Sequence, residues 1–338
     1  MNALKVLRIG PLVSIQDQGR PGQLQQGVSR GGAVDLLALA EGAALLRQSA
    51  DLAALEMAGM GGLFEATGPL RIALTGAPMQ VSLDGEALAW NASHQMQAGQ
   101  RLEIGAARRG VYGYLHLGGG IDSAVMLGAR AAHLMSGLGR TIAVDDLLPC
   151  GPDQSSETGL GLTPEDRFQG GTLRIVAGFQ SDLFAADVRA RFAETGFRRG
   201  SRANRMGGEL VSDGAGFAAE GQLNILSEII VPGDVQMTGD GKPFVLLREA
   251  QTTGGYPRIG TVLPCDLPRV GQAQAGTELR FDWVSLEEGL ALQARHDAQM
   301  KSLPGQCMPL LRDPAHMQDL LAYQLISGVV SADTDPFA

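Results

Sequence analysis

Residues 244–263 have the sequence FVLLREAQTTGGYPRIGTVL, in which an apolar run is interrupted by polar residues and glycines and then resumes. A simple β-hairpin needs only two to five residues between its strands. The interrupting stretch contains the turn formers Gly and Pro, but it also carries more hydrogen-bonding side chains than a turn requires. We therefore expect two strands joined by a loop whose side chains face a ligand.

Short segments of alternating polarity recur on both sides of this stretch and predict further strands. They are Leu70–Thr75, Val81–Leu83, Arg101–Ile104, Val111–Leu117, Leu173–Val176 and Thr277–Val284. Asp84 and Gly85 lie between two of them and predict a type I′ hairpin turn, in which both central residues need a positive φ. The 47 glycines also favour a chain with many tight turns. The sequence therefore predicts a mainly β protein with a few helices.

Four segments have helical spacing of apolar residues or a helix start signal. They are Val34–Arg47, Ser181–Glu194, Ser285–Lys301 and Pro314–Ile326. We expect Ser181, which is followed by Asp, to cap the second of them. The stretch 151–164 is rich in Gly, Pro, Ser and Thr and predicts a linker. The strands therefore form one group before this linker and one after it.

The two groups share a faint internal repeat. The sequence EATGPLRIALTGA at 65–77 is followed by QAGQRL at 97–102. In the second group, QMTGDGKPFVLLREA at 236–250 is followed by QAGTEL at 274–279. We interpret the repeat as two related β-rich halves, and chance similarity between Gly-rich hairpins is the alternative.

Composition argues against several classes of protein. The net charge is −9 and no basic run is present, which argues against a nucleic-acid partner. No uninterrupted apolar stretch reaches the length of about 18 residues that a membrane span needs, and the N-terminus lacks the features of a signal peptide. The three cysteines form no C-x-x-C pair, and the five histidines have no metal-ligand spacing. We therefore expect a cytoplasmic protein with free thiols and no metal site.

Three short motifs are similar to known sites but have weak support. The sequence GVSRG at 27–31 matches the nucleophile elbow of Ser hydrolases, yet residues 23–26 are a poor core strand to precede it. A hydrolase that uses Ser29 is kept as an alternative hypothesis. GKP at 241–243 lacks the spacing of a phosphate-binding loop, and GGGID at 118–122 does not fit the dinucleotide-binding pattern.

Three clusters place Asp, Arg, Gln, Asn or Thr beside Gly, where exposed backbone can approach a ligand. They are SIQDQGRPG at 14–22 with GGAVD at 31–35, NRMG at 204–207, and the interrupting stretch 248–260. Any one of them can be a turn held by bonds from side chains to backbone. Their recurrence in one chain favours a shared cleft.

These clusters resemble motifs of the biotin-dependent carboxyltransferase family, whose members are also called allophanate hydrolase subunit 2 or KipA-type proteins. The matching motifs are QDQGR at 16–20, GGAVD at 31–35, Glu56, TGA at 75–77, YLHLGGGID at 114–122, LGAR at 127–130, GR at 139–140, NRMG at 204–207, QTTGGYP at 251–257 and LAYQLISGVV at 321–330. They are long, and they extend over nearly the whole chain.

The resemblance implies a fold of two cyclophilin-like β-barrel subdomains with a cleft between them, in agreement with the internal repeat. We expect the first barrel at 1–150, a linker at 151–170, the second barrel at 171–284 and a helical C-terminal tail at 285–338.

The resemblance also implies one of three roles. One branch of the family is the carboxyltransferase part of urea carboxylase, which moves a carboxyl group from biotin to urea. Another is the C subunit of the bacterial ATP-dependent 5-oxoprolinase, an amidohydrolase that opens the cyclic amide of 5-oxoproline to L-glutamate. The third consists of KipA-type regulatory proteins that bind a kinase inhibitor. Stand-alone bacterial members most resemble the 5-oxoprolinase branch, which is therefore our first expectation.

Partners and cofactors follow from the same resemblance. A 5-oxoprolinase subunit would share ATP with a B-type subunit, which is similar to allophanate hydrolase subunit 1 or KipI, and with a LamB/YcsF-like A-type subunit. Under the carboxyltransferase alternative, biotin would arrive on a separate chain, because MKS at 300–302 lies in a predicted helix and has no carrier fold around it.

Charged residues of the first two clusters and of LGAR at 127–130 are candidates for the site that the resemblance implies. Arg20, Arg130 and Arg205 would hold phosphate or carboxylate, since a guanidinium binds either group through two donors. Asp17 and Asp35 would orient these arginines or act as a base. A loop-capping role is the alternative for both carboxylates.

The remaining candidates all lie in the interrupting stretch. They are Gln251, Thr252, Thr253, Gly254, Gly255 and Tyr256. The Gln amide and the Thr hydroxyls would bind an amide or ureido group through donor and acceptor contacts. The glycines would let the backbone come close, and the Tyr would supply a donor or a stacking face.

Several positions depart from the family pattern and put the substrate in doubt. The family has hydroxyl side chains where this chain has alanines, Asp where it has Glu, and a different residue after the RMG element. These positions are Ala129, Ala131, Ala132, Gly208 and Glu249. AGFQ at 177–180 replaces a usual GPQ.

Overall fold

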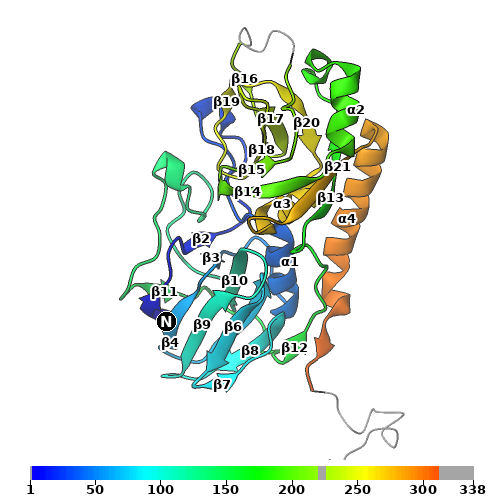
Figure 1. The fold of residues 1–338 in the computed structure, drawn as a ribbon. Coiled ribbons are helices and arrows are strands. Elements are labelled where there is room, and N and C mark those ends of the chain that lie inside the picture. Colours follow the sequence, from blue (N-terminus) through cyan, green and yellow to red (C-terminus); the bar gives the residue numbers. More distant parts are fainter. Residues whose placement is uncertain (1, 220–225, 312–338) are drawn as a thin grey trace, which may run out of the picture.

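The computed structural model describes residues 2–219 and 226–311, which form two groups of strands with one long helix beside both (Figure 1). Within these residues the chain is mainly β, and its helices are few. The predicted fold class is therefore confirmed.

The first half contains two antiparallel sheets around one core. The six-stranded sheet has the order β11 (Leu147–Pro149), β1 (Ala3–Ile9), β4 (Gly62–Ala66), β9 (Arg101–Ala107), β6 (Met79–Leu83) and β7 (Glu86–Ala87). The seven-stranded sheet has the order β2 (Ser14–Gln16), β3 (Ala54–Ala58), β10 (Tyr112–Leu117), β5 (Leu70–Gly76), β8 (Ala92–Met96), β12 (Leu160–Gly161) and β22 (Met308–Pro309). Buried side chains of both sheets, among them Phe64 and Leu115, share one hydrophobic cluster. The expected first barrel thus takes the form of two sheets packed on one core.

The second half contains a closed seven-stranded barrel. Its strands, in order around the barrel, are β13 (Gly171–Val176), β20 (Arg258–Val262), β17 (Asp234–Met237), β18 (Pro243–Leu246), β15 (Gly207–Val211), β14 (Phe197–Asn204) and β21 (Glu278–Trp283). The rings of Phe192, Phe197, Phe217 and Phe281 pack in its core, with centroids 4.5 to 5.7 Å apart. This aromatic cluster gives the second half a hydrophobic core of its own.

The helices cover the sheets and connect the two halves. They are α1 (Leu36–Leu45), α2 (Ala186–Glu194), α3 (Leu267–Gln272) and α4 (Leu286–Gln306). Short 3-10 turns are η1 (Leu24–Gln26), η2 (Leu134–Ser136), η3 (Ser181–Leu183) and η5 (Pro264–Asp266). α1 packs against β5 and β10, while α4 contacts both α1 and β13. The long α4, drawn in orange in Figure 1, therefore runs from the barrel back to the first half.

Helix starts follow the capping chemistry of the sequence in two of three cases. The Asp35 carboxylate caps α1 by accepting from the N–H of Ala38 at 3.1 Å. Ser285 and Glu288 form a capping box at the start of α4. The prediction for Ser181 was wrong: it lies in η3, and α2 begins five residues later without a side-chain cap.

Turn and linker predictions have mixed outcomes. Asp84 and Gly85, with φ of 49° and 90°, join β6 to β7 as the type I′ turn predicted. The stretch 151–164 contains β12, which pairs with β8 and β22, so part of the predicted linker belongs to a sheet. The predicted helix 314–326 lies outside the described residues. No helix in the described ranges is long and apolar enough to cross a membrane.

The repeated segments are arranged differently in the two halves. In the second half, β17 and β18 pair directly as neighbours in the barrel. In the first half, the corresponding segment 65–77 supplies β4 and β5, which lie in different sheets. The repeat therefore does not correspond to one shared strand pairing.

Candidate functional site

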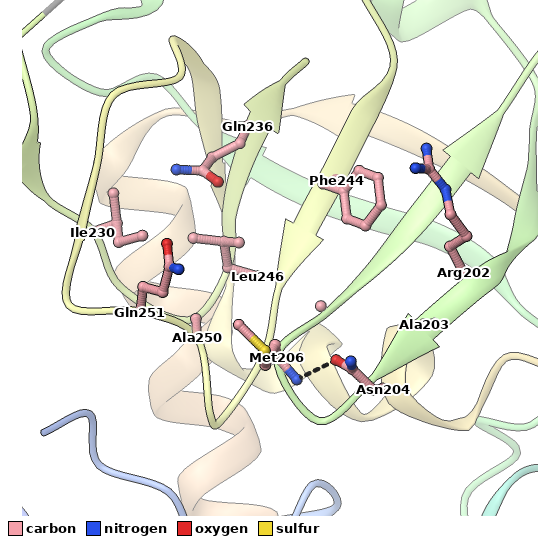
Figure 2. Close-up of a pocket in the computed structure, with 11 residues that line it drawn as sticks. Arg202, Ala203, Asn204, Met206, Ile230, Gln236, Phe244, Leu246, Ala250 and Gln251 are labelled. Atoms are coloured by element: carbon pink, nitrogen blue, oxygen red, sulfur yellow. Dashed lines mark hydrogen bonds between the residues drawn. The ribbon is translucent and has the colours of Figure 1, made fainter. Parts of the chain in front are cut away.

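A pocket of about 340 Å³ lies against the barrel wall (Figure 2). Its walls come from β14, β15, β17 and β18 and from the residues that follow β18. Apolar walls are formed by Met206, Ile230, Phe244, Leu246 and Ala250. Polar groups are supplied by Arg202, Asn204, Gln236 and Gln251. This mixture of apolar walls and a few polar groups is typical of a small-molecule site.

Two carboxamides face the same space in this pocket. Figure 2 shows the side chains of Gln236 and Gln251 pointing toward one another beside Leu246. Gln236 is only 8% exposed, and its side chain borders the pocket. A ligand that covers this amide must supply it with hydrogen-bond partners. The pocket is therefore polar at one defined point and can hold a ligand with amide-like donors and acceptors.

The interrupting stretch covers one side of this pocket. Its residues Thr253–Gly254 form β19, which pairs with β16 (Glu228–Ile229) as a separate two-stranded ribbon. A Cβ atom at Gly254 would lie 2.6 Å from Nε2 of Gln236, so a larger residue at this position would have to displace the amide of Gln236. The stretch is thus long because it makes a ribbon beside the pocket as well as a turn.

Not all the predicted residues of this stretch line the pocket. Gln251 does, whereas Tyr256 is 52% exposed and does not. Thr253 and Gly255 are exposed, and Thr252 contributes its carbonyl, which accepts from the N–H of Ile230 at 3.1 Å. The ligand contacts predicted for the hydroxyls and for the Tyr ring stay predictions.

A buried charge network lies on the other side of the turns that form the pocket. Its centre is Arg205, between the pocket residues Asn204 and Met206. The guanidinium donates from Nε to Glu249 at 2.6 Å, from Nη1 to Glu56 and from Nη2 to the carbonyl of Gly32 at 2.6 Å. The two carboxylates raise the pKa of Arg205 and keep it protonated despite its burial.

This network connects the two halves of the molecule. Glu56 and Gly32 belong to the first half, whereas Arg205 and Glu249 belong to the second. Glu56 also accepts from the hydroxyl of Tyr114 at 2.6 Å, and burial together with this carboxylate raises the pKa of that phenol. The guanidinium of Arg205, which was predicted to bind phosphate, therefore already donates to acceptors of the protein itself. Arg205 acts as a structural link, or strut, between the two halves.

Asp35 has a structural position of the same kind. It is fully buried, caps α1, and accepts from Nε of Arg167 at 2.6 Å and from Nε2 of Gln272 at 2.8 Å. Arg167 in turn forms an ion pair with Glu41. The contacts of this carboxylate are all with the protein itself, which agrees with the capping alternative and gives no sign of a base.

Asp17 also holds loops together. Its carboxylate accepts from the N–H of Gly19 at 2.8 Å and from the N–H of Arg130 at 2.6 Å. The side chain of Arg130 is partly exposed and pairs with Asp122 at 2.7 Å. The structure therefore brings Asp17 and Arg130 together through backbone contacts.

Three arginines keep a buried nitrogen without a partner in the described part of the chain, and they are Arg20, Arg199 and Arg248. Arg20 is 1% exposed and donates to the carbonyl groups of Met126 and Ala131, but its Nη1 has no acceptor. Arg248, which the sequence did not single out, has no acceptor for Nε, and burial lowers its pKa to about 10. Of the predicted arginines, Arg20 therefore has the clearest spare donor for an anion.

Ser29 does have a histidine neighbour, but the geometry does not suit a nucleophile. Its Oγ lies 2.8 Å from Nε2 of His133, whose Nδ1 accepts from the N–H of Ser136. Burial lowers the pKa of His133 and favours the neutral ring, and because Nδ1 accepts from Ser136 the ring proton is left to Nε2. In a catalytic pair Nε2 must accept the serine proton, and Nδ1–H must donate to an orienting group. The pair therefore has the wrong tautomer for a Ser hydrolase.

The residues at which this chain departs from the family pattern are mostly buried, and most of their contacts are made by backbone atoms. The carbonyl of Ala131 accepts from Arg20, and the N–H of Ala132 donates to Ile15. Glu249 is the exception, because its carboxylate binds Arg205 directly. The acidic function at that position is therefore retained in a longer side chain.

Gln236 was missed by sequence reasoning, although a signal existed. The strand DVQM at 234–237 is buried throughout, and a Gln in a buried strand needs a partner.

No group of three or more His, Cys, Asp or Glu within residues 2–219 and 226–311 is placed to hold a metal ion.

Known proteins are similar to this chain over most of its length. The carboxyltransferase domain, subdomains A and B, matches residues 26–283. The C subunit of 5-oxoprolinase from Escherichia coli is 34% identical over 304 residues, which cover 88% of this chain and 95% of that protein. The C subunit of 5-oxoprolinase from Haemophilus influenzae is 28% identical over 304 residues, which cover 89% of this chain and 97% of that protein. The urea amidolyase of Saccharomyces cerevisiae is 24% identical over 90% of this chain but only 18% of that protein.

Solved structures agree. A crystal structure of TTHA0988 has a TM-score of 0.76 and 29% identity over 83% of this chain, which spans 55% of that longer chain. The crystal structure of the Kluyveromyces lactis urea carboxylase has a TM-score of 0.78 and 21% identity. The match covers 92% of this chain and 31% of the urea carboxylase chain, and it shows that the two folds are alike. With a family match over most of its residues and a 34% identical relative of nearly equal extent, the chain belongs to the carboxyltransferase domain family, subdomains A and B.

Proposed function

We propose that this chain is the C subunit of an ATP-dependent 5-oxoprolinase in the cytoplasm. The reaction opens 5-oxoproline to L-glutamate at the expense of ATP, with A- and B-type subunits as partners. The observation that carries the proposal is the 34% identity to the 5-oxoprolinase C subunit of Escherichia coli, which extends over 95% of that protein. The pocket supports it, because apolar walls with two carboxamides suit a small cyclic amide.

The chain's own part in the reaction is to bind and orient the cyclic amide. Opening a lactam is difficult because resonance stabilises the amide, and phosphorylation of the amide oxygen by ATP turns that oxygen into a leaving group. Donors placed near developing charge lower such barriers. Arg20 and Arg248 each have a spare nitrogen donor at the junction of the two halves, outside the lining of the pocket, and the carbonyl of Arg248 accepts from Gly31 in the loop that follows Arg20.

The N-termini of the described α-helices do not fit a phosphate group. Helix N-termini bind phosphate when they present free N–H groups and no negative charge. Here every described α-helix has a carboxylate in its cap or first turn: Asp35, Asp187, Asp266 and Glu288. We therefore assign the binding of ATP to the partner subunits and propose that the active site is completed at their interface.

The test is to co-express the chain with its A- and B-type neighbours and to measure ATP-dependent release of glutamate from 5-oxoproline. We expect activity from the complex, little or none from the isolated chain, and co-purification with the B-type subunit. Full activity of the isolated chain, or no association on co-expression, would contradict the proposal.

The urea amidolyase relatives favour biotin-dependent carboxyl transfer as a second candidate. The same preparation separates the two, since carboxylation of urea that depends on a separate biotinylated chain, without 5-oxoproline cleavage, would favour that candidate. Binding of a kinase-inhibitor partner without either activity would favour a KipA-type regulator.

A further inference from the structure

The carboxamide of Gln236 is largely buried and borders the pocket. It projects from β17 of the closed barrel, where the flanking residues Val235 and Met237 are fully buried in the core. Its neighbours in the pocket are the apolar side chains of Ile230 and Leu246 (Figure 2). A ligand that reaches this amide must therefore bring its own donor and acceptor into apolar surroundings.

A primary carboxamide presents N–H and C=O on one edge. A five-membered lactam is a cis amide, so its N–H and C=O also lie on one edge. The two edges are complementary and form two parallel hydrogen bonds. An open-chain secondary amide is trans, because the cis form costs about 2.5–4 kcal/mol. Its N–H and C=O point in opposite directions, so that only one of the two bonds can form.

We propose that Gln236 recognises the cis-amide edge of a cyclic amide and is the residue that selects a lactam ring over open-chain amides. The proposal rests on the proposed function for the identity of the ligand, which is the ring of 5-oxoproline. The shared chemistry also includes the ureido ring of biotin, which presents the same edge.

The surroundings of Gln236 support selection of a small ring. Gln251 lies across the pocket, where its amide can close over the bound ring (Figure 2). Gly254 lies against Nε2 of Gln236, where even a methyl group at 2.6 Å would displace the amide. The ribbon of β16 and β19 therefore lies against the amide of Gln236 on one side.

The experiment measures binding to the assembled complex by calorimetry without ATP, so that no turnover occurs. The ligands are 5-oxoproline, N-methyl-5-oxoproline, N-acetylglycine and free biotin. N-methylation removes the lactam donor and leaves one polar group of Gln236 buried without a partner, so we expect binding to weaken by about tenfold to a hundredfold. N-acetylglycine, a trans amide, should also bind more weakly, by about tenfold or more.

Two variants complete the design. Gln236→Leu keeps the approximate shape of the side chain but removes both polar atoms, and Gln80→Leu in β6 is the matched control on an exposed strand position of the first half. In Gln236→Leu the difference between 5-oxoproline and its N-methyl derivative should disappear, because the partner of the lactam N–H has gone. In Gln80→Leu the difference should remain.

The outcomes separate this proposal from the proposed function. If the complex cleaves 5-oxoproline but wild type binds the lactam and its N-methyl derivative equally, or binds neither, the role of Gln236 is wrong and the function stands. A second outcome is that the complex does not cleave 5-oxoproline, yet wild type binds the N-methyl derivative more weakly than the lactam and Gln236→Leu does not. In that case the role of Gln236 stands and the proposed 5-oxoprolinase function is wrong. Tight binding of biotin with the same dependence would identify the ureido ring as the ligand. Should Gln236→Leu not fold, the comparison of ligands on wild type decides alone.

Discussion

Replacement of Arg205 by Met should destabilise the protein strongly, even though this residue resembles a ligand-binding arginine in the sequence. The guanidinium lies between the carboxylates of Glu56 and Glu249, and both of these are only 2–3% exposed. Removal of the cation leaves two buried negative charges facing each other and frees the carbonyl of Gly32. Breaking a buried ion pair in this way typically costs about 3–5 kcal/mol.

The cost converts into a measurable change of melting temperature. For a cooperative unit of 338 residues the entropy of unfolding is about 0.7 kcal/mol/K, so we expect a decrease in Tm of about 4–7 °C. Differential scanning calorimetry on Arg205→Met, with urea unfolding as an independent measure, gives this value. Arg205→Lys should fall between wild type and Arg205→Met, because one ammonium cannot reach all three acceptors at once.

The matched control is Arg198→Met in β14, the strand that leads into the turn of Arg205. Arg198 pairs with Asp213 at 3.0 Å, but the two side chains are 50% and 88% exposed. An exposed pair contributes about 0–1 kcal/mol, so Tm should change by only about 1 °C. If Arg205→Met melts no lower than Arg198→Met, then Arg205 is not a strut between the halves, and its role as a ligand-binding group regains support.

Three further results are expected. Gly42→Ala in α1 should lower the free energy of unfolding by about 1–3 kcal/mol, because the new Cβ would overlap the ring of His116. Gly305→Ala in α4 is the control, since its new Cβ meets no atom within 4 Å and the change should be neutral or stabilising. Equal urea midpoints for the two variants would refute this expectation. Burial lowers the pKa of His116 to about 3, so between that value and 6.5 the unfolded chain binds a proton that the folded chain does not. The neutral His116 ring therefore contributes its full share of stability above pH 6.5, and this share is lost as pH falls, by up to about 1.4 kcal/mol per pH unit. The free energy of unfolding of His116→Gln should consequently decline less steeply than that of wild type between about pH 7 and 5. A fluorophosphonate probe should not label Ser29, because His133 cannot accept its proton, and labelling that disappears in Ser29→Ala would revive the hydrolase hypothesis.

The local elements could be predicted because their causes lie within a few residues. The predicted segments 70–75 and 111–117 match β5 and β10 almost to the residue, and both strands are buried along their whole length, as short apolar runs of this size often are. The turn at Asp84 and Gly85 and the capping box at Ser285 likewise depend on neighbours in the chain. Ser181 misled because a Ser before Asp can hold a 3-10 turn as well as a helix: its Oγ accepts from the N–H of Gly178 and donates to the carbonyl of Ile259.

The site could be predicted in its segments but not in its side chains. The sequence brought forward both turns that border the pocket, 204–207 and 248–251, because polar residues beside Gly are unusual next to apolar strands. Within each turn, however, neighbouring side chains point to opposite sides. Arg205 and Glu249 are directed into the junction of the halves, while Asn204, Met206 and Gln251 line the pocket. No local pattern says which side a turn residue faces.

By itself, then, the sequence determined the mainly β character, several of the strands and helices, and the family, all of which depend on spacing along the chain or on long motifs. The tertiary structure alone decided which groups meet. Arg205 reaches Glu56 across 149 residues, Ser29 meets His133 across 104, and Gln236 faces Gln251 over an apolar wall. Such contacts arise from how two sheets, a barrel and α4 pack together, and that packing depends on the shapes of whole surfaces. A charged or polar side chain therefore becomes a strut, a cap or a binding group only when the fold supplies its partner.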